Sequence, residues 1–189
     1  MIYGTTFTEA SRVEAADEPA DLLMDEETFR GFYERTARGV WAYLARLTGD
    51  RHLADDLLQE TYYRFLRASA RHTTEAHRRN SLYRIATNLA RDSHRRRVVH
   101  GAGEEVNPET LAAGAQSPER SADFSRAMSR LNPRERAMLW LAYAEGATHE
   151  EIAGVLGLRT GSLKPLLFRA RRKLAALLSG ETPGGELPR

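Results

Sequence analysis

The side chains with the clearest chemistry in this sequence are arginines, and they gather in two segments. Residues 64–97 hold ten arginines and two acidic residues, and residues 159–173 hold six basic residues and no acid. Clustered cations bind polyanions such as nucleic acids, because they release the counterions condensed along the phosphate backbone. One basic run is usually a solvated helix face, but two runs on two helical segments favour nucleic-acid binding.

The second basic segment has the spacing of a helix-turn-helix. Ala153 is small enough for two helices to cross closely, Gly157 suits the left-handed backbone of a tight turn, and Leu163 returns to the shared core. The second helix of such a pair presents polar and basic side chains to a major groove. An ordinary helical hairpin with a basic exit helix is the alternative. The side chains expected to face outward include Thr160, Ser162, Lys164 and Arg169.

The composition argues against catalysis. The 189 residues contain no cysteine, which excludes a disulfide scaffold, a zinc–thiolate site and a cysteine nucleophile. The six histidines form no ligand pair at helical spacing, and no glycine-rich phosphate loop or nucleophile elbow is present. No apolar run approaches the roughly 18–20 residues that span a bilayer, and the first residues lack a signal-peptide pattern. We therefore expect a cytoplasmic protein that is not an enzyme, with no cofactor, no metal and no membrane insertion.

We predict that the segments carrying these residues are helical throughout, since no convincing alternation of apolar and polar residues indicates a strand. Large apolar residues recur at steps of three and four from residue 27 to residue 97, which predicts three amphipathic helices. Gly49-Asp50 separates the first two, and a polar stretch at 69–79 precedes the third. Helix-start signals then recur at Ser117, Asn132 and Thr148.

We predict an all-α protein of two small helical domains, an N-terminal helical bundle and a C-terminal helix-turn-helix, joined by a flexible linker. The predicted parts are an acidic disordered leader at 1–26, a helical domain at 27–97, a linker at 98–116, a helix-turn-helix domain at 117–178 and a disordered tail at 179–189. A sharper hypothesis for the leader is that its negative charge shields a basic DNA-binding face.

Three motifs together resemble a bacterial RNA polymerase sigma factor of the extracytoplasmic-function (ECF) type. Residues 54–60 (ADDLLQE) are similar to the family's acidic DLVQE segment, and residues 82–92 (LYRIATNLARD) are similar to its LYxIARNLALD helix. The third motif runs from LNPRER at 131–136 to the end of the basic helix. The resemblance covers residues 27–178, in family order and with family-like spacing.

The resemblance implies a sigma factor that directs RNA polymerase to specific promoters. In the family, the second helix docks on the clamp helices of the polymerase's largest subunit, and an acidic strip suits arginine partners there. A solvated surface face is the alternative reading of this strip. The residues implied for core polymerase binding are Asp55, Asp56, Leu57, Gln59 and Glu60.

The resemblance also implies contacts with two elements of promoter DNA. In the family, the third helix holds the opened −10 element and the helix-turn-helix reads the −35 element. The residues implied for −10 binding are Asn80, Tyr83, Arg84, Asn88, Arg91, Arg95 and Arg96. The residues implied for −35 binding are Arg159, Thr160, Ser162, Lys164, Pro165, Arg169 and Arg172. An anti-sigma factor is a further candidate partner.

Some positions depart from the family pattern. Ser81 stands where the family usually has a tryptophan, and Pro165 and Leu166 replace a serine and an arginine. A proline inside a helix removes a backbone hydrogen bond and disfavours helical geometry at the preceding residue, so we expect the reading helix to start later or to bend. Phe168 is an apolar residue on a surface that is normally polar, where it either packs on thymine methyl groups or joins the core.

Two other classes of protein compete with the sigma factor. A helix-turn-helix regulator that acts without core polymerase would use the same C-terminal domain. An interaction adaptor that binds no DNA would leave the charge of the second basic segment unexplained. Binding to core polymerase separates the regulator from a sigma factor, and salt-dependent DNA binding separates the adaptor from both.

Overall fold

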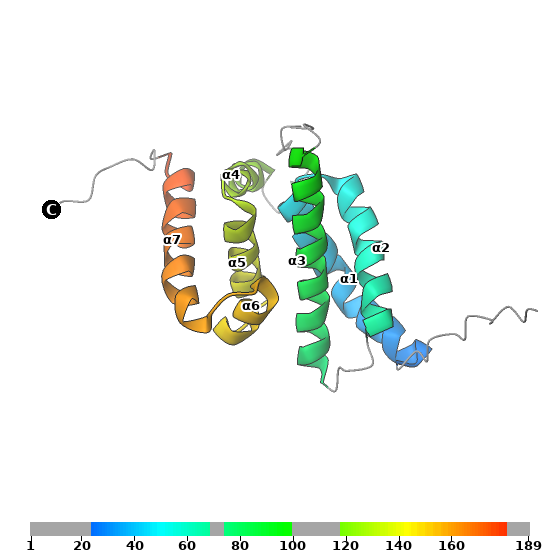
Figure 1. The fold of residues 1–189 in the computed structure, drawn as a ribbon. Coiled ribbons are helices and arrows are strands. Elements are labelled where there is room, and N and C mark those ends of the chain that lie inside the picture. Colours follow the sequence, from blue (N-terminus) through cyan, green and yellow to red (C-terminus); the bar gives the residue numbers. More distant parts are fainter. Residues whose placement is uncertain (1–23, 69–73, 100–117, 181–189) are drawn as a thin grey trace, which may run out of the picture.

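The computed structural model describes residues 24–68, 74–99 and 118–180, and these residues form helices and no strand (Figure 1). The helices are α1 (Glu26–Thr48), α2 (Arg51–Ala68), α3 (Glu75–Val99), α4 (Pro118–Ser129), α5 (Pro133–Tyr143), α6 (His149–Leu156) and α7 (Thr160–Leu178). The predicted all-α class is confirmed. Among these helices, none has both the length and the apolarity needed to cross a membrane. Most of the predicted leader, linker and tail lie outside the described residues.

Several helix ends follow signals that the sequence displays. Gly49 ends α1 with φ of 71° and Gly157 ends α6 with φ of 66°, both in the left-handed region that favours glycine. Asn132 and Thr148 each form a capping box with the glutamate three residues later. These caps fix the ends of α1, α5 and α6 where the sequence analysis predicts them.

α3 is longer than predicted at both ends. It begins at Glu75 instead of near residue 80, because the Thr74 hydroxyl oxygen accepts the backbone N–H of His77 at 3.2 Å and supports a first turn that is polar and exposed. At its other end α3 continues to Val99, within the segment predicted to be linker. α1 likewise begins one residue earlier than the predicted domain boundary.

α1, α2 and α3 pack around an apolar core of their own. The rings of Phe32 on α1 and Phe65 on α2 stack at a centroid distance of 5.1 Å in its centre. Tyr33 on α1 is 41% exposed, and its ring packs against that of Tyr62 at a centroid distance of 4.7 Å. Other large buried side chains of this core include Val40, Tyr43, Leu44, Leu47, Leu57, Tyr62, Leu82, Tyr83 and Leu89.

α4 to α7 form the second unit, and its helix-turn-helix has the predicted register. Ala153 is buried, and Gly157 makes the turn between α6 and α7. Leu163 is fully buried on α7 and closes the shared core. This core also buries Ile152, Leu156 and Leu167.

The helix α7 runs through Pro165 without a break, so the predicted later start is wrong. Pro165 lies in the second turn, where it removes the hydrogen bond that would end on the carbonyl oxygen of Gly161. Gly161 is exposed, which lets water take the place of the missing donor. The missing donor therefore leaves no buried carbonyl without a partner.

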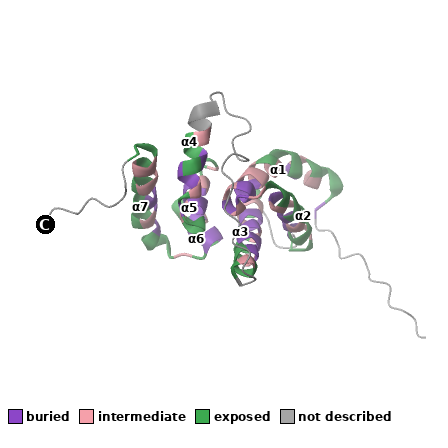
Figure 2. Cartoon of the chain, turned by 90° about the horizontal axis from the view of Figure 1, so that it is seen from above, coloured by how far each residue is buried: buried purple, intermediate pink, exposed green. Residues whose placement is uncertain are grey.

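The two units are packed against each other. α3 contacts α6 and α1 contacts α5, and buried residues of both units form one continuous cluster. Figure 1 shows α3 between the α1–α2 pair and the helix-turn-helix unit, and Figure 2 shows the same order from above. The sequence predicts a linker between the units, and this contact between them was not foreseen from it.

The left-handed turn of the helix-turn-helix leads to a stability prediction. Gly157→Ala should destabilise the protein by about 1 kcal/mol, because a side chain disfavours positive φ. Gly154→Ala is the matched control, since no atom lies within 4 Å of the added Cβ in either variant. Within α6 the new alanine should stabilise by about 0.5–1 kcal/mol. Urea midpoints measure both, and shifts in the same direction would contradict the assigned turn.

Candidate nucleic-acid interface

All the residues predicted for −35 binding are exposed, and they lie on α7 or directly before it. Arg159 precedes the helix in an extended conformation, and the others lie along its first turns and its outer face. Two further basic residues of this segment are held by their own unit: Lys173 Nζ donates to Glu135 Oε2 at 2.9 Å, and Arg171 donates to the Tyr143 hydroxyl at 3.2 Å. The exposed residues of the predicted set are Arg159, Thr160, Ser162, Lys164, Pro165, Arg169 and Arg172.

Phe168 and Leu166, two departures from the family pattern on α7, differ in their exposure to solvent. Phe168 is 51% exposed, with the Arg171 guanidinium 5.9 Å from its ring centre, so the alternative in which it joins the core is wrong. Leu166, which replaces an arginine, is half-buried and packs against the core. The exposed surface of α7 thus has an aromatic ring and lacks one cation.

α3 exposes most of the residues predicted for −10 binding. Its buried stripe, which includes Leu82 and Leu89, faces α1 and α2, and the basic residues lie outside it. Arg95 pairs with Asp92 at 3.2 Å, but both side chains are largely exposed, so this ion pair contributes little stability. The exposed members of the predicted set are Arg84, Asn88, Arg91, Arg95 and Arg96.

Tyr83 and Asn80 of the predicted −10 set are not on this exposed surface. Tyr83 is 3% exposed and packs edge-on against Tyr43 at 5.2 Å, which corrects the expectation that its ring is available to bases. Burial, together with the hydrogen bond and negative charge of Glu145, raises the pKa of the Tyr83 hydroxyl well above its usual value. Asn80 is half-buried and donates from Nδ2 to Glu151 Oε1 at 3.1 Å.

Glu151 has two partners at this junction. Its carboxylate accepts the backbone N–H of Thr148 at 2.8 Å as part of the capping box of α6, and it also accepts the Asn80 amide. These hydrogen bonds, the Thr148 one first, lower the pKa of Glu151, so it carries a full charge at neutral pH.

The acidic strip on α2 is mostly exposed. Asp55, Asp56 and Gln59 face solvent, and Glu60 is half-buried. The Asp55 carboxylate accepts the indole N–H of Trp41 at 2.7 Å, which fixes its position. Leu57, the fifth residue predicted to contact the polymerase, is not part of this surface.

Leu57 is 6% exposed and belongs to the core of the N-terminal unit. It follows Ala54 and precedes Thr61 on the buried stripe of α2, at steps of three and four. The prediction that Leu57 contacts the polymerase is therefore corrected: it supports the strip from within.

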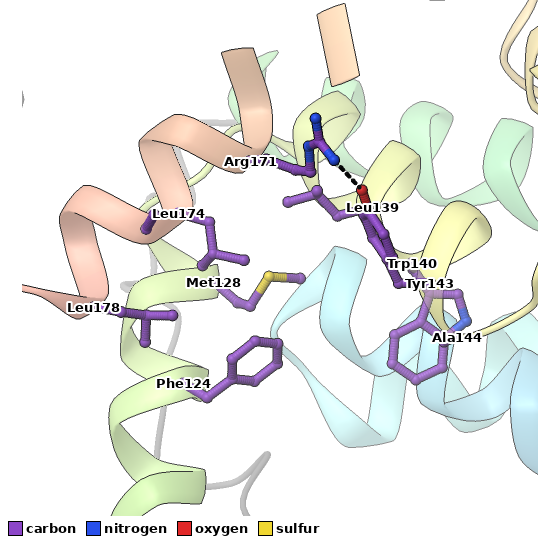
Figure 3. A pocket seen from close by; sticks show the side chains of 10 residues that line it. Phe124, Met128, Leu139, Trp140, Tyr143, Ala144, Arg171, Leu174 and Leu178 are labelled. Carbon is purple, nitrogen blue, oxygen red and sulfur yellow. Dashed lines mark hydrogen bonds between the residues drawn. The ribbon is translucent and has the colours of Figure 1, made fainter. Parts of the chain in front are cut away.

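An apolar groove, which the sequence analysis did not predict, lies between α4, α5 and α7. Its volume is about 430 Å³, and Phe124, Met128, Trp140 and Leu174 are among the side chains that line it (Figure 3). The Arg171–Tyr143 hydrogen bond lies at its edge. Phe124 and Tyr143 are exposed aromatic residues, the signal that a sequence can give for such a surface.

Arg46 is a second feature missed by sequence reasoning. It extends from α1 to the other unit, where its guanidinium lies 5.7 Å from the ring centre of Phe124 and 5.2 Å from that of Trp140. Burial lowers the pKa of Arg46, and its Nη1 atom has no hydrogen-bond partner. In the sequence Arg46 lies between the apolar residues Ala45 and Leu47, and the structure buries both of these neighbours.

A helix-turn-helix with an exposed basic face, joined to a helical bundle with a second basic face, defines a DNA-binding protein of two units. Family models add that residues 32–98 match "Sigma-70 region 2" and residues 121–174 match "Sigma-70, region 4". The ECF RNA polymerase sigma factor SigE of Mycolicibacterium smegmatis is 31% identical over 95% of this chain and 76% of its own length. RNA polymerase sigma factor CarQ of Myxococcus xanthus is 31% identical over 81% of this chain and 90% of its own length.

The chain belongs to the ECF family of RNA polymerase sigma factors. It is thus an alternative sigma factor that directs RNA polymerase to promoters, and its partners are core polymerase and promoter DNA. The fold agrees with that of the sigma factor RpoE, solved in complex with the anti-sigma factor NepR from Bartonella quintana. That structure has a TM-score of 0.71 and 22% identity, and the match covers 82% of this chain and 98% of RpoE. A regulator that acts without polymerase is not supported.

Proposed function

We propose that this sigma factor reads the −35 element with α7, holds the opened −10 strand with α3 and docks on the polymerase's largest subunit through α2. The observation that carries the proposal is the division of exposed charge: α3 and α7 carry cations, whereas the exposed strip on α2 carries carboxylates. Cationic surfaces attract DNA, and an acidic strip repels it but suits arginines of a protein partner. The factor acts by binding alone, without a reaction of its own, and works in the cytoplasm with the polymerase.

In this proposal α7 combines base and phosphate contacts in a major groove. Thr160 and Ser162 lie at the N-terminal end of the helix, the end that reaches base edges in helix-turn-helix proteins. Arg169 and Arg172 lie further along and hold phosphates, which fix the orientation of the helix. Phe168 packs on thymine methyl groups, which favours A·T pairs beneath it.

On α3, Arg84, Asn88 and Arg91 recur at helical spacing and form a track for a single strand. Guanidinium and amide groups hydrogen-bond unstacked bases, and arginine planes also stack on them. Trapping unpaired bases offsets an unpairing cost of a few kcal/mol, so melting needs no ATP. Arg95 and Arg96 hold phosphates at the far end of the track.

An anti-sigma factor is a second proposed partner. RpoE and CnrH, solved with the anti-sigma factor NepR and the cytosolic domain of CnrY, share this fold, and the CnrH structure has a TM-score of 0.60. The groove between α4, α5 and α7 offers such a partner an apolar surface with Arg171 at its edge. An amphipathic helix with an acidic residue beside its apolar face has the matching chemistry.

The proposed −35 contacts predict a change in salt dependence. Arg169→Ala with Arg172→Ala should weaken binding to duplex DNA and reduce the slope of log K against log salt by about 2, since each phosphate contact contributes about 0.9. Lys173→Ala is the control on the same helix, because Glu135 already pairs with this lysine. Fluorescence anisotropy over a salt series measures the slopes, and equal slopes for all three proteins would exclude the phosphate contacts.

The acidic strip predicts a loss of polymerase binding. Asp56→Arg with Gln59→Ala should abolish association with core polymerase, because it places a cation against the partner's arginines at a cost of about 2–5 kcal/mol. Glu34→Arg, at an exposed carboxylate on α1, is the control and should bind normally. Gel filtration with purified core enzyme measures association. Runoff transcription that survives the double change would show that the docking surface lies elsewhere.

Runoff transcription with purified core enzyme on a library of genomic fragments tests the proposed function as a whole. We expect transcripts that start downstream of a shared pair of promoter elements. A protein that binds DNA but neither co-migrates with core enzyme nor yields transcripts would contradict the proposal.

A further inference from the structure

The neighbouring helix α1 holds one carboxylate of the acidic strip on α2. Trp41 on α1 donates its indole N–H to Asp55 Oδ1 at 2.7 Å, a short hydrogen bond to a charged acceptor. Glu60 of the same strip pairs within its own helix, with Arg64 at 2.5 Å. An exposed ion pair of that kind contributes little stability and is screened by salt. The two carboxylates are thus held in different ways, Asp55 from across the helix pair and Glu60 along its own helix.

The Trp41 ring is itself well fixed. Its side chain is half-buried and packs against the buried core. The Arg51 guanidinium, at the start of α2, lies 5.2 Å from the centre of the ring, within the range of a cation–π contact. Because an indole N–H can only donate, the ring offers Asp55 one defined hydrogen bond. Contacts with the core and with Arg51 therefore keep this donor directed at the carboxylate.

The bond to Trp41 leaves Asp55 able to bind a second group. Asp55 is exposed, and the indole occupies one acceptor site on its Oδ1 atom. A carboxylate has about four such sites over its two oxygens, enough to accept two parallel N–H donors of a guanidinium as well. An exposed aspartate otherwise samples several rotamers, and fixing one of them on binding costs free energy. Since Trp41 already selects a rotamer, that cost is incurred when the chain folds and not when it binds.

We propose that Trp41 is a positioning residue for polymerase binding, which holds Asp55 in the orientation that accepts a guanidinium of the partner. The proposal rests on the assignment of polymerase docking to α2. Trp41 acts through Asp55 and makes no contact of its own with the partner. Its effect on binding is therefore present only in chains that have Asp55, whereas a contribution to folding alone would not depend on that residue.

The hydrogen bond is tested first in the free protein, by NMR of the indole N–H groups. The chain has two tryptophans, Trp41 and Trp140, and therefore two indole signals. Trp41→Phe assigns the first of them by removing it. Asp55→Ala should shift the Trp41 signal several times further than Asp56→Ala does. Equal shifts in the two alanine variants would contradict the bond and with it the proposal.

The second test is a double-mutant cycle on binding to purified core polymerase, measured by biolayer interferometry. Trp41→Phe keeps an aromatic ring and the net charge and should weaken binding about fivefold. At 1.4 kcal/mol per tenfold this is about 1 kcal/mol, the cost of ordering one side chain. Combined with Asp55→Ala it should have no further effect, whereas combined with Asp56→Ala it should again cost about fivefold. Equal losses in both backgrounds would show that Trp41 acts without Asp55, which would overturn the proposal.

Tyr62→Phe is the matched control for the loss of a hydrogen bond between α1 and α2. The Tyr62 hydroxyl lies 2.7 Å from Thr36 Oγ1, but Tyr62 is buried and its partner is not a residue of the acidic strip. Both Trp41→Phe and Tyr62→Phe should lower the urea midpoint of unfolding. Polymerase binding should weaken with Trp41→Phe alone, and equal losses of binding would assign the effect to stability and exclude a positioning role.

A second replacement of Trp41 keeps the inference testable if Trp41→Phe fails to fold, as judged by circular dichroism. Benzothienylalanine, introduced at position 41 by stop-codon suppression, has the bicyclic shape of tryptophan with sulfur in place of the N–H group. It keeps the packing and the contact with Arg51 and removes the donor alone. We expect the same fivefold loss, and again none in the Asp55→Ala background. Unchanged binding in an otherwise unaltered chain would refute the proposal.

Asp55→Ala by itself separates this inference from the proposed function. It should weaken binding to core polymerase about tenfold or more if α2 is the docking surface. Undiminished binding of this variant and of Asp56→Arg with Gln59→Ala would place docking elsewhere, and both the proposed function of α2 and this inference would fall. Weakened binding of those variants, together with no effect of Trp41→Phe, would overturn the inference alone.

Discussion

α3 packs against helices of both units and is buried from two sides. One side, with Leu82 and Leu89, completes the core of α1 and α2, and another faces α6 through Asn80. A helix of this length has only one strip of surface left for solvent, and here that strip is basic. The residues proposed to contact DNA and those that contact the other unit are therefore neighbours on one helix. Any movement of the helix-turn-helix unit changes how much of α3 is accessible.

The junction between the units gains specificity from buried polar groups instead of apolar area alone. Arg46 loses hydration between two aromatic rings and leaves Nη1 unpaired, which offsets part of the cation–π attraction. Trp140 donates to Glu145, whose charge also raises the pKa of the buried Tyr83 hydroxyl, so a displacement of the units would cost a polar group its partner. Contacts of this kind fix one orientation of the units, alongside the buried apolar cluster that the two units share.

Local signals in the sequence were sufficient for the fold of each unit. Capping boxes, left-handed glycines and apolar spacing depend on residues a few positions apart, and the ends of α5 and α6 follow from them. The start of α3 was missed because its first turn is polar and exposed, so no buried stripe marks it; Thr74 was the readable signal.

The candidate site was less predictable, because its errors come from contacts distant in sequence. Tyr83 looked like an exposed ring at the start of a helix, and only the approach of Glu145 from the other unit explains its burial. Leu57 was assigned to a surface by its place in a motif although its spacing put it in the core. The seven residues assigned to −35 binding are exposed as expected, since the helix-turn-helix register follows from Ala153, Gly157 and Leu163 alone.

The replacements on α7 shift the balance of contacts available for reading DNA. Pro165 removes one backbone hydrogen bond but fixes φ near its helical value, which also reduces the entropy of the unfolded chain. Leu166 turns toward the core, so the cation that the family places there is absent, while Phe168 remains exposed beside Arg171. Phosphate contacts contribute affinity and apolar contacts with thymine methyl groups contribute discrimination. With the −35 contacts proposed for α7, exchanging one cation for an exposed ring would lower sequence-independent attraction and raise the share of binding that depends on the promoter sequence.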